Sequence, residues 1–121
     1  MMSLLYIFIG GGMGALSRYG VSCLFPIEAG SNKLPYSTLL CNVLGCLLIG
    51  ILFAWQKNYN PSWLQPLLIT GLLGGFTTFS AFGLDTQKLI QNGATGTAIL
   101  YVSISVTLGL ATVFLGIKLI K

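Results

Sequence analysis

The fold of this chain is decided by a stretch without acidic or basic residues, positions 58–84, which reads NYNPSWLQPLLITGLLGGFTTFSAFGL. Two further stretches, 34–56 and 89–117, also lack Asp, Glu, Lys and Arg. A membrane-spanning helix needs about 20 mostly apolar residues, so each stretch is long enough to cross a bilayer. The segment from Leu4 to Phe25 meets the same requirement, with Arg18 as its single interruption. The sequence therefore predicts an all-α membrane protein with four transmembrane helices.

The composition of the chain agrees with a lipid environment. Of its 121 residues 7% are charged and 55% are hydrophobic, and the mean hydropathy is +0.88. The absence of His and the presence of only 2 acidic residues exclude His-based acid–base catalysis, carboxylate pairs and His-rich metal sites. An odd number of cysteines within predicted spans, Cys23, Cys41 and Cys46, argues against a disulfide framework or a zinc site. We expect a protein that is not an enzyme and has no nucleic-acid partner.

Polar and turn-forming residues separate the four apolar segments. The N-terminus lacks the basic segment of a signal peptide, so the first segment is expected to be retained as a helix. Asn92 and Gly93 are expected to turn the chain between the third and fourth helices. Four spans leave only short connections, which predicts a single domain over residues 1–121. The predicted helices run over about 3–25, 36–56, 63–91 and 95–118.

The third segment contains weak helix formers in the middle of a span. Gly71, Gly74 and Gly75 precede Thr77, Thr78 and Ser80, which predicts a break in the third helix at mid-membrane. Unwound backbone inside a bilayer is tolerated where it is buried in protein or lines a cavity, and its carbonyls can coordinate a cation. Phe79 and Phe82 share one helix face, where they either pack in a core or present positively polarised ring edges.

The positive charges are evenly divided between the two ends of the predicted spans. An even number of spans places both termini on one side of the membrane, and the positive-inside rule then sets the orientation. A count of 3 against 3 predicts insertion in both orientations, unless the N-terminal amine decides the balance. Lys57, Lys118 and Lys121 are counted on the terminal side, and Arg18, Lys33 and Lys88 on the other.

Two polar side chains within predicted spans each allow two interpretations. Arg18 would cost about 2.5 to 3.5 kcal/mol at the centre of a membrane helix. It either extends to the lipid headgroups or lines an aqueous vestibule that concentrates anions. Asn42 either makes an interhelical hydrogen bond or donates its amide hydrogens to a dehydrated anion.

Small and hydroxyl-bearing residues form patterns on the first, third and fourth helices. Gly10 with Gly14, and Gly71 with Gly75, have the spacing that lets membrane helices approach closely. Gly10, Gly12 and Ala15 also fit a dinucleotide-binding fingerprint, which is rejected because no βαβ unit or suitably placed acidic residue accompanies them. Hydroxyls lie along one face of the fourth helix, where Ser and Thr can instead bond to their own i−4 carbonyls. These residues are Thr97, Tyr101, Ser105 and Thr112.

Three motifs identify a family that the chain resembles over nearly its whole length. The chain is similar to the Fluc (CrcB) fluoride channels, small four-helix membrane proteins of microbes. Two positions depart from the family pattern, because Ala81 replaces a common hydroxyl residue and Gly109 falls where Ser often continues the fourth-helix track. The motifs are Gly10-Gly11-Gly12 with Gly14-Ala15 and Arg18-Tyr19, Ser37-Thr38-Leu39 with Asn42 and Gly45, and Gly74-Gly75-Phe76-Thr77-Thr78-Phe79-Ser80-Ala81-Phe82.

The resemblance implies an antiparallel dual-topology dimer in a bacterial plasma membrane, formed by two copies or with a second homologue. Two fluoride pores would follow the subunit interface, with Arg18 near a vestibule. A structural sodium ion at the dimer centre would be held by the backbone carbonyls of Gly74 and Thr77. The implied pore residues are Asn42, Phe79, Ser80, Phe82, Tyr101, Ser105 and Thr112.

The implied function is passive export. HF enters the cell, dissociates in the more alkaline cytoplasm, and leaves as fluoride through the channel. A small proton-coupled exporter of toxic cations is the main alternative, but exporters of that kind resemble one another in using a Glu in the first helix, and here Glu28 lies beyond Pro26. An accessory subunit whose glycines serve only packing is a second alternative.

Overall fold

The computed structural model describes residues 1–26 and 32–120, and these residues form helices joined by short connections. Helix α1 covers Met2–Leu24, α2 covers Tyr36–Gln56 and α5 covers Thr95–Leu119. The third helical segment consists of the π-helix η1 (Leu64–Leu73), the short α3 (Gly74–Phe76) and α4 (Phe79–Gln91). The prediction of an all-α protein with four helical segments is confirmed. Glu28, named for the exporter alternative, and Lys121, counted among the positive charges, lie outside the described residues.

Three of the helical segments are long and apolar enough to cross a membrane, judged by length and composition. They are α2, the 28 residues of Leu64–Gln91, and α5. The chain is therefore a multi-pass membrane protein. Helix α1 has 23 residues, which is also the length of a span, but it carries Arg18 among its apolar residues.

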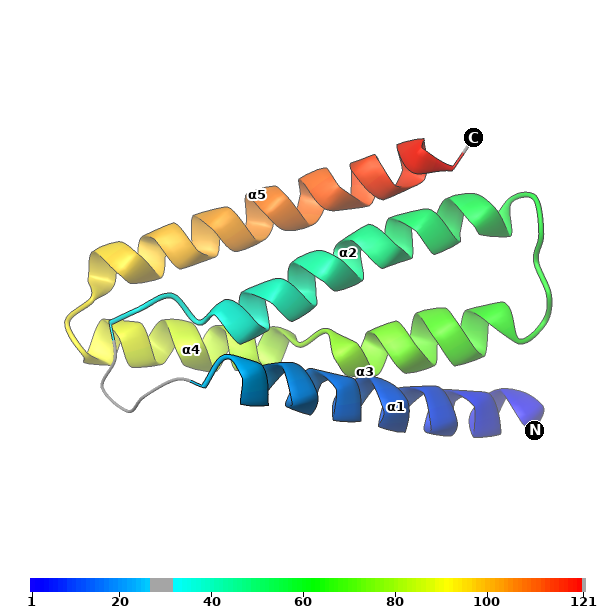
Figure 1. The fold of residues 1–121 in the computed structure, drawn as a ribbon, viewed down its shortest axis with the longest axis horizontal. Helices are drawn as coiled ribbons and strands as arrows, with labels where there is room; N and C mark the ends of the chain where they lie inside the picture. Colours follow the sequence, from blue (N-terminus) through cyan, green and yellow to red (C-terminus); the bar gives the residue numbers. More distant parts are fainter. Residues whose placement is uncertain (27–31, 121) are drawn as a thin grey trace.

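The helices lie side by side in an elongated bundle (Figure 1). Helix α1 packs mainly against η1 and α3, α2 packs mainly against α5, and α4 also contacts α5. Both termini lie at the same end of the bundle, as four antiparallel segments require (Figure 1). This order places the junction of α3 and α4 at the middle of the bundle, next to both α1 and α2.

Glycines bring α1 close to the third segment. A Cβ atom on Gly14 would overlap the Leu72 carbonyl oxygen, and one on Gly75 would overlap the Gly11 carbonyl oxygen. A Cβ on Gly71 would lie 3.1 Å from the Gly10 Cα. The prediction that Gly10, Gly14, Gly71 and Gly75 permit close helix packing is confirmed, and their backbones approach too closely for any larger residue.

The turn after α4 follows the sequence expectation. Gly93 has a φ of +80°, a left-handed conformation that glycine adopts without steric cost. The Gly93 N–H donates to the Ile90 carbonyl at 3.1 Å, and the Ala94 N–H donates to the Leu89 carbonyl at 2.8 Å. These two bonds form a Schellman motif, so the predicted turn at Asn92 and Gly93 is confirmed.

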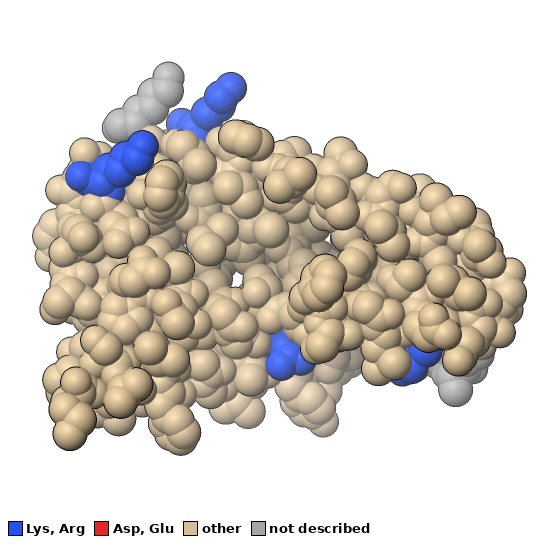
Figure 2. Space-filling model, turned by 180° about the vertical axis from the view of Figure 1, so that it is seen from behind, with Lys and Arg blue, Asp and Glu red and all other residues tan. Residues whose placement is uncertain are grey.

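The outer surface matches the composition. Figure 2 shows a face on which apolar and uncharged residues cover almost the whole area, with a few Lys and Arg side chains and no Asp or Glu visible. Many large apolar side chains are exposed, among them Phe8, Leu16, Phe53 and Phe114. In a multi-pass membrane protein such side chains contact lipid.

Candidate functional site

Two extended residues separate α3 from α4. Thr77 has φ −85° and ψ 156°, and Thr78 has φ −152° and ψ 120°, which are β-region values. The Thr77 N–H and hydroxyl both donate to the Leu73 carbonyl, at 3.0 and 2.9 Å. The Thr78 hydroxyl oxygen accepts the Ala81 N–H at 3.1 Å and so caps α4. The Thr77 N–H and the hydroxyls of Thr77 and Thr78 are thus bonded locally.

Asn42 on α2 binds the backbone of Thr78 through two hydrogen bonds. Its Oδ1 accepts the Thr78 N–H at 2.8 Å, and its Nδ2 donates to the Thr78 carbonyl at 3.0 Å. In a continuous helix the Thr78 N–H would donate to the Gly74 carbonyl, but here it is engaged by Asn42. The interhelical interpretation of Asn42 is therefore what the structure shows. One amide hydrogen of the side chain remains for another acceptor.

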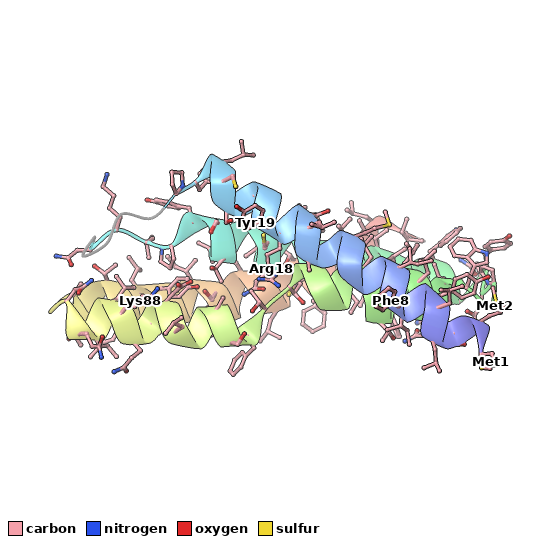
Figure 3. All side chains as sticks on the ribbon, turned by 90° about the horizontal axis from the view of Figure 1, so that it is seen from below. Met1, Met2, Phe8, Arg18, Tyr19 and Lys88 are labelled. Carbon is pink, nitrogen blue, oxygen red and sulfur yellow. The ribbon has the colours of Figure 1, made fainter. Side chains whose placement is uncertain are left out.

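Arg18 on α1 points toward the connection between α3 and α4 (Figure 3). Its Nε donates to the Gly75 carbonyl at 3.1 Å, in partly buried surroundings. This contact favours an interior position of the Arg18 side chain over extension to the lipid headgroups. Arg18 also lines a recess of about 170 Å³, and none of the described residues around that recess carries a carboxylate. They are Arg18, Tyr19, Ser22, Ser37, Thr38, Cys41, Thr78 and Ala81.

Three aromatic rings form a row from the surface to the interior. The ring centroids of Phe79 and Phe82 are 5.6 Å apart, and those of Phe82 and Tyr101 are 5.1 Å apart. Phe79 is 84% exposed, whereas Tyr101 has 0% exposure and belongs to a core cluster with Leu89 and Ala98. Phe82 packs against that cluster. Core packing therefore accounts for Phe82 in part, and it does not account for Phe79.

Tyr101 has a partner that the sequence did not suggest. Its hydroxyl donates to Oδ2 of Asp85 at 3.4 Å. Asp85 is not among the site residues predicted from the sequence. The sequence signal that could have suggested this contact is the Asp85 carboxylate, one turn after Phe82 on the helix that packs against α5. The phenol hydroxyl thus has a carboxylate partner on α4.

The other two predicted donors on α5 differ from each other. The Ser105 hydroxyl oxygen is buried and has no hydrogen-bond partner among the described residues. The Thr112 hydroxyl donates to the Leu108 carbonyl at 2.8 Å and also lies 3.3 Å from the Val43 carbonyl. Ser105 thus has an unused donor, while Thr112 makes the i−4 bond anticipated for membrane helices.

The structure brings four of the predicted site residues to one groove. Asn42, Gly74, Thr77 and Phe79 line a groove of about 310 Å³ together with apolar residues of α2 and η1. Ser80, Phe82, Tyr101, Ser105 and Thr112 are not among the residues that line it. Ser80 is exposed, and its hydroxyl lies 3.2 Å from that of Thr78.

The structure shows the surroundings of the two residues that depart from the family pattern, Ala81 and Gly109. Ala81 uses its backbone N–H, bonded to the Thr78 hydroxyl, so the cap of α4 does not require a hydroxyl side chain at that position. Gly109 is buried, and a Cβ there would lie 3.5 Å from the Cys46 Sγ. All three cysteines are free.

Comparison with known proteins identifies the family. Residues 5–117 match the family described as CrcB-like protein, Camphor Resistance (CrcB). The chain belongs to the CrcB family. The CrcB chain is 42% identical over 118 residues to a protein of Novosphingobium aromaticivorans, with 96% of this chain and 94% of the relative covered.

Two further relatives of this CrcB chain show similar identity. It is 40% identical over 123 residues to a protein of Flavobacterium psychrophilum, covering 100% of this chain and 98% of the relative. It is 45% identical over 115 residues to a protein of Paracoccus denitrificans, covering 93% and 90%. All three relatives are named fluoride-specific ion channel FluC.

Proposed function

We propose that this CrcB protein is a fluoride-selective ion channel, and not an enzyme, which carries fluoride passively out of the bacterial cytoplasm and so reduces fluoride toxicity. The observation that carries the proposal is the identity of 40 to 45% with relatives named fluoride-specific ion channels, over at least 93% of this chain. The membrane would be the bacterial plasma membrane, with α1 as a fourth span beside the three apolar segments.

The proposed pore residues are Asn42, Phe79, Ser80, Phe82, Tyr101, Ser105 and Thr112, with a vestibule at Arg18. An anion stripped of water needs hydrogen-bond donors and positively polarised groups. The remaining Asn42 amide hydrogen, the unpaired Ser105 hydroxyl and the exposed edge of Phe79 can supply them. The recess around Arg18 supports a vestibule, because it combines a guanidinium group with the hydroxyls of Ser37 and Thr38.

The extended residues Thr77 and Thr78 support a break of the third span at mid-membrane. The chemistry there fits a sodium ion, which prefers oxygen ligands such as unwound backbone carbonyls. Gly74 and Thr77 line the same groove, and the N–H that would pair with the Gly74 carbonyl in a helix is bonded to Asn42. Their carbonyls would hold the ion, whose charge would stabilise the converging carbonyl dipoles.

The proposed assembly is an antiparallel dual-topology dimer, formed by two copies or with a second homologue. Two carbonyls are too few to surround a cation, and a partner related by a two-fold axis in the membrane plane would supply two more. Phe79 supports an interface near the break, because it is the first residue of α4 and is 84% exposed.

A flux measurement tests the function. Purified protein in liposomes loaded with potassium fluoride should release fluoride when valinomycin allows charge balance, as recorded with a fluoride electrode. Chloride-loaded liposomes should retain chloride under the same conditions. Failure of wild-type protein to release fluoride would contradict the proposal. Proton-dependent uptake of an organic cation instead would favour a proton-coupled exporter.

Removal of sodium should lower the fluoride flux. We expect protein dialysed for a long time into N-methylglucamine to lose most of its activity, because a bulky organic cation cannot enter a cluster of carbonyls. Residual sodium is measured by atomic emission, and sodium is then returned to check recovery. Equal flux in protein shown to be free of sodium would contradict a structural ion.

Additional positive charge at the C-terminus should bias the orientation of the protein. The count of 3 against 3 is easily altered, so two Lys residues added after Lys121 should place the C-terminus in the cytoplasm. C-terminal reporters that are active only inside or only outside the cell measure this. Both should work for the native chain, and the added lysines should also reduce fluoride resistance.

The same reporters separate the two forms of the dimer. A native chain found in one orientation only would contradict pairing of two identical copies. It would indicate instead that a second, oppositely inserted homologue is the required partner.

A further inference from the structure

Arg18 bonds to the backbone of Gly75, two residues before the first extended residue, Thr77. In a continuous helix the Gly75 carbonyl would accept the N–H of Phe79, four residues later. Phe79 instead begins α4 after Thr77 and Thr78, so this bond is not available. The Arg18 Nε supplies the missing donor at 3.1 Å. A carbonyl in a membrane interior is costly without a partner, and a cation at a helix C-terminus is also favoured by the helix dipole.

The close approach of α1 puts Arg18 at this position. Gly11 lies against Gly75, and Gly14 lies against Leu72 and Phe76. Arg18 follows these glycines by seven and four residues, which places it on the same face of α1. The contacts of Gly11, Gly14 and Arg18 therefore lie along one continuous interface between α1 and the third segment.

Asn42 and Arg18 hold the two sides of the break from different helices. Arg18 on α1 binds the carbonyl of Gly75, and Asn42 on α2 binds the N–H and carbonyl of Thr78. The carbonyls proposed to bind sodium belong to Gly74 and Thr77, each directly next to a held residue. Displacement of either anchor would move these carbonyls.

We propose that Arg18 is a positioning residue for the break between α3 and α4, and that it acts through its Nε–H donor to the Gly75 carbonyl and not through its charge alone. Arginine has five N–H donors, so this role leaves four for the recess. The inference rests on the proposed function for its effect on fluoride flux, but its effect on the backbone is independent of that function.

Two substitutions separate the donor from the charge. In Arg18→Gln the amide nitrogen is attached to Cδ, as Nε is in arginine, so the donor is retained without the charge. In Arg18→Lys the charge is retained, but a methylene group occupies the place of Nε. Lys57→Gln is the matched control, because it removes the same charge from an exposed residue that caps α2.

Hydrogen exchange of the Thr77, Thr78 and Ala81 amides is the primary measurement, made on full-length protein in sodium-containing detergent solution. We expect exchange in Arg18→Lys to be about tenfold faster than in the wild type, which is the lower range for losing a hydrogen bond to a charged group. Arg18→Gln and Lys57→Gln should match the wild type. Amides of α5 serve as an internal reference for global unfolding.

Two results would overturn the inference. One is wild-type exchange at the three amides in Arg18→Lys, and the other is equally accelerated exchange in Arg18→Gln and Arg18→Lys. Fluoride efflux is measured on the same samples, and about a tenfold loss is expected in Arg18→Lys. In Arg18→Gln the flux should also fall, because the proposed vestibule loses its positive charge, while hydrogen exchange stays at the wild-type rate. Absence of flux in the wild type would refute the channel function, while the exchange data would still decide the role of Arg18.

Discussion

Replacing Phe79 or Phe82 by Ile is expected to reduce fluoride efflux from liposomes by about a hundredfold, which corresponds to a barrier increase of about 2.7 kcal/mol. Ile keeps much of the bulk of the ring but removes the quadrupole, whose positive edge can face an anion. Phe79 is the sharper test because it is 84% exposed, so that its replacement leaves the core unchanged.

The control for this prediction is Phe114→Ile on α5. Phe114 is exposed and takes part in none of the ring pairs of the described residues. Its replacement should leave the flux unchanged. The elution volume on a sizing column should be the same for all three variants, which separates loss of conduction from loss of assembly. Wild-type flux through Phe79→Ile and Phe82→Ile would remove the aromatic role.

Replacing Asn42 by Leu is expected to abolish most of the fluoride flux and to lower the unfolding temperature. The substitution leaves the Thr78 N–H and carbonyl without the partners they have at 2.8 and 3.0 Å. These groups are partly buried, and an unsatisfied buried group costs about 1 to 3 kcal/mol. Fluoride efflux and thermal unfolding in detergent measure the two effects.

The variant Asn42→Asp separates the backbone contact from the pore. Asp keeps an acceptor for the Thr78 N–H, so its unfolding temperature should lie between those of the wild type and Asn42→Leu. Its negative charge should nevertheless prevent fluoride conduction. Asn58→Leu, at an exposed position after α2, controls for the loss of a surface amide. Unchanged flux and stability in Asn42→Leu would contradict the role of Asn42 at the break.

The sequence predicted the elements that depend on local composition. Apolar stretches of span length predict helices in any membrane protein, because the bilayer leaves the backbone no other way to bond within one segment. Gly93 predicted a turn because few other residues adopt a positive φ. The glycine pairs on α1 and the third segment predicted close packing because spacing alone places them on one face.

The hydrogen-bonding pattern within the third segment was harder to predict from the sequence. The structure has a π-helix over Leu64–Leu73, where the sequence predicted only a helix followed by a break. The Gly74 N–H donates to the Ile69 carbonyl five residues earlier, as π-helices require. Pro66 lacks an N–H and was the one local signal of altered bonding.

The sequence by itself determined the membrane class, the helical segments and the polar residues available for a site, because these follow from hydropathy, spacing and side-chain chemistry. Only the tertiary structure decided the partners of those residues. The sequence allowed two interpretations for each of Arg18 and Asn42. The choice between them depended on which group, distant in the sequence, lies within hydrogen-bond distance of the side chain, about 3 Å. Gly75 and Thr78 are separated from them by 57 and 36 positions. Such contacts arise when α1 and α2 pack against the third segment, and no local pattern encodes that arrangement.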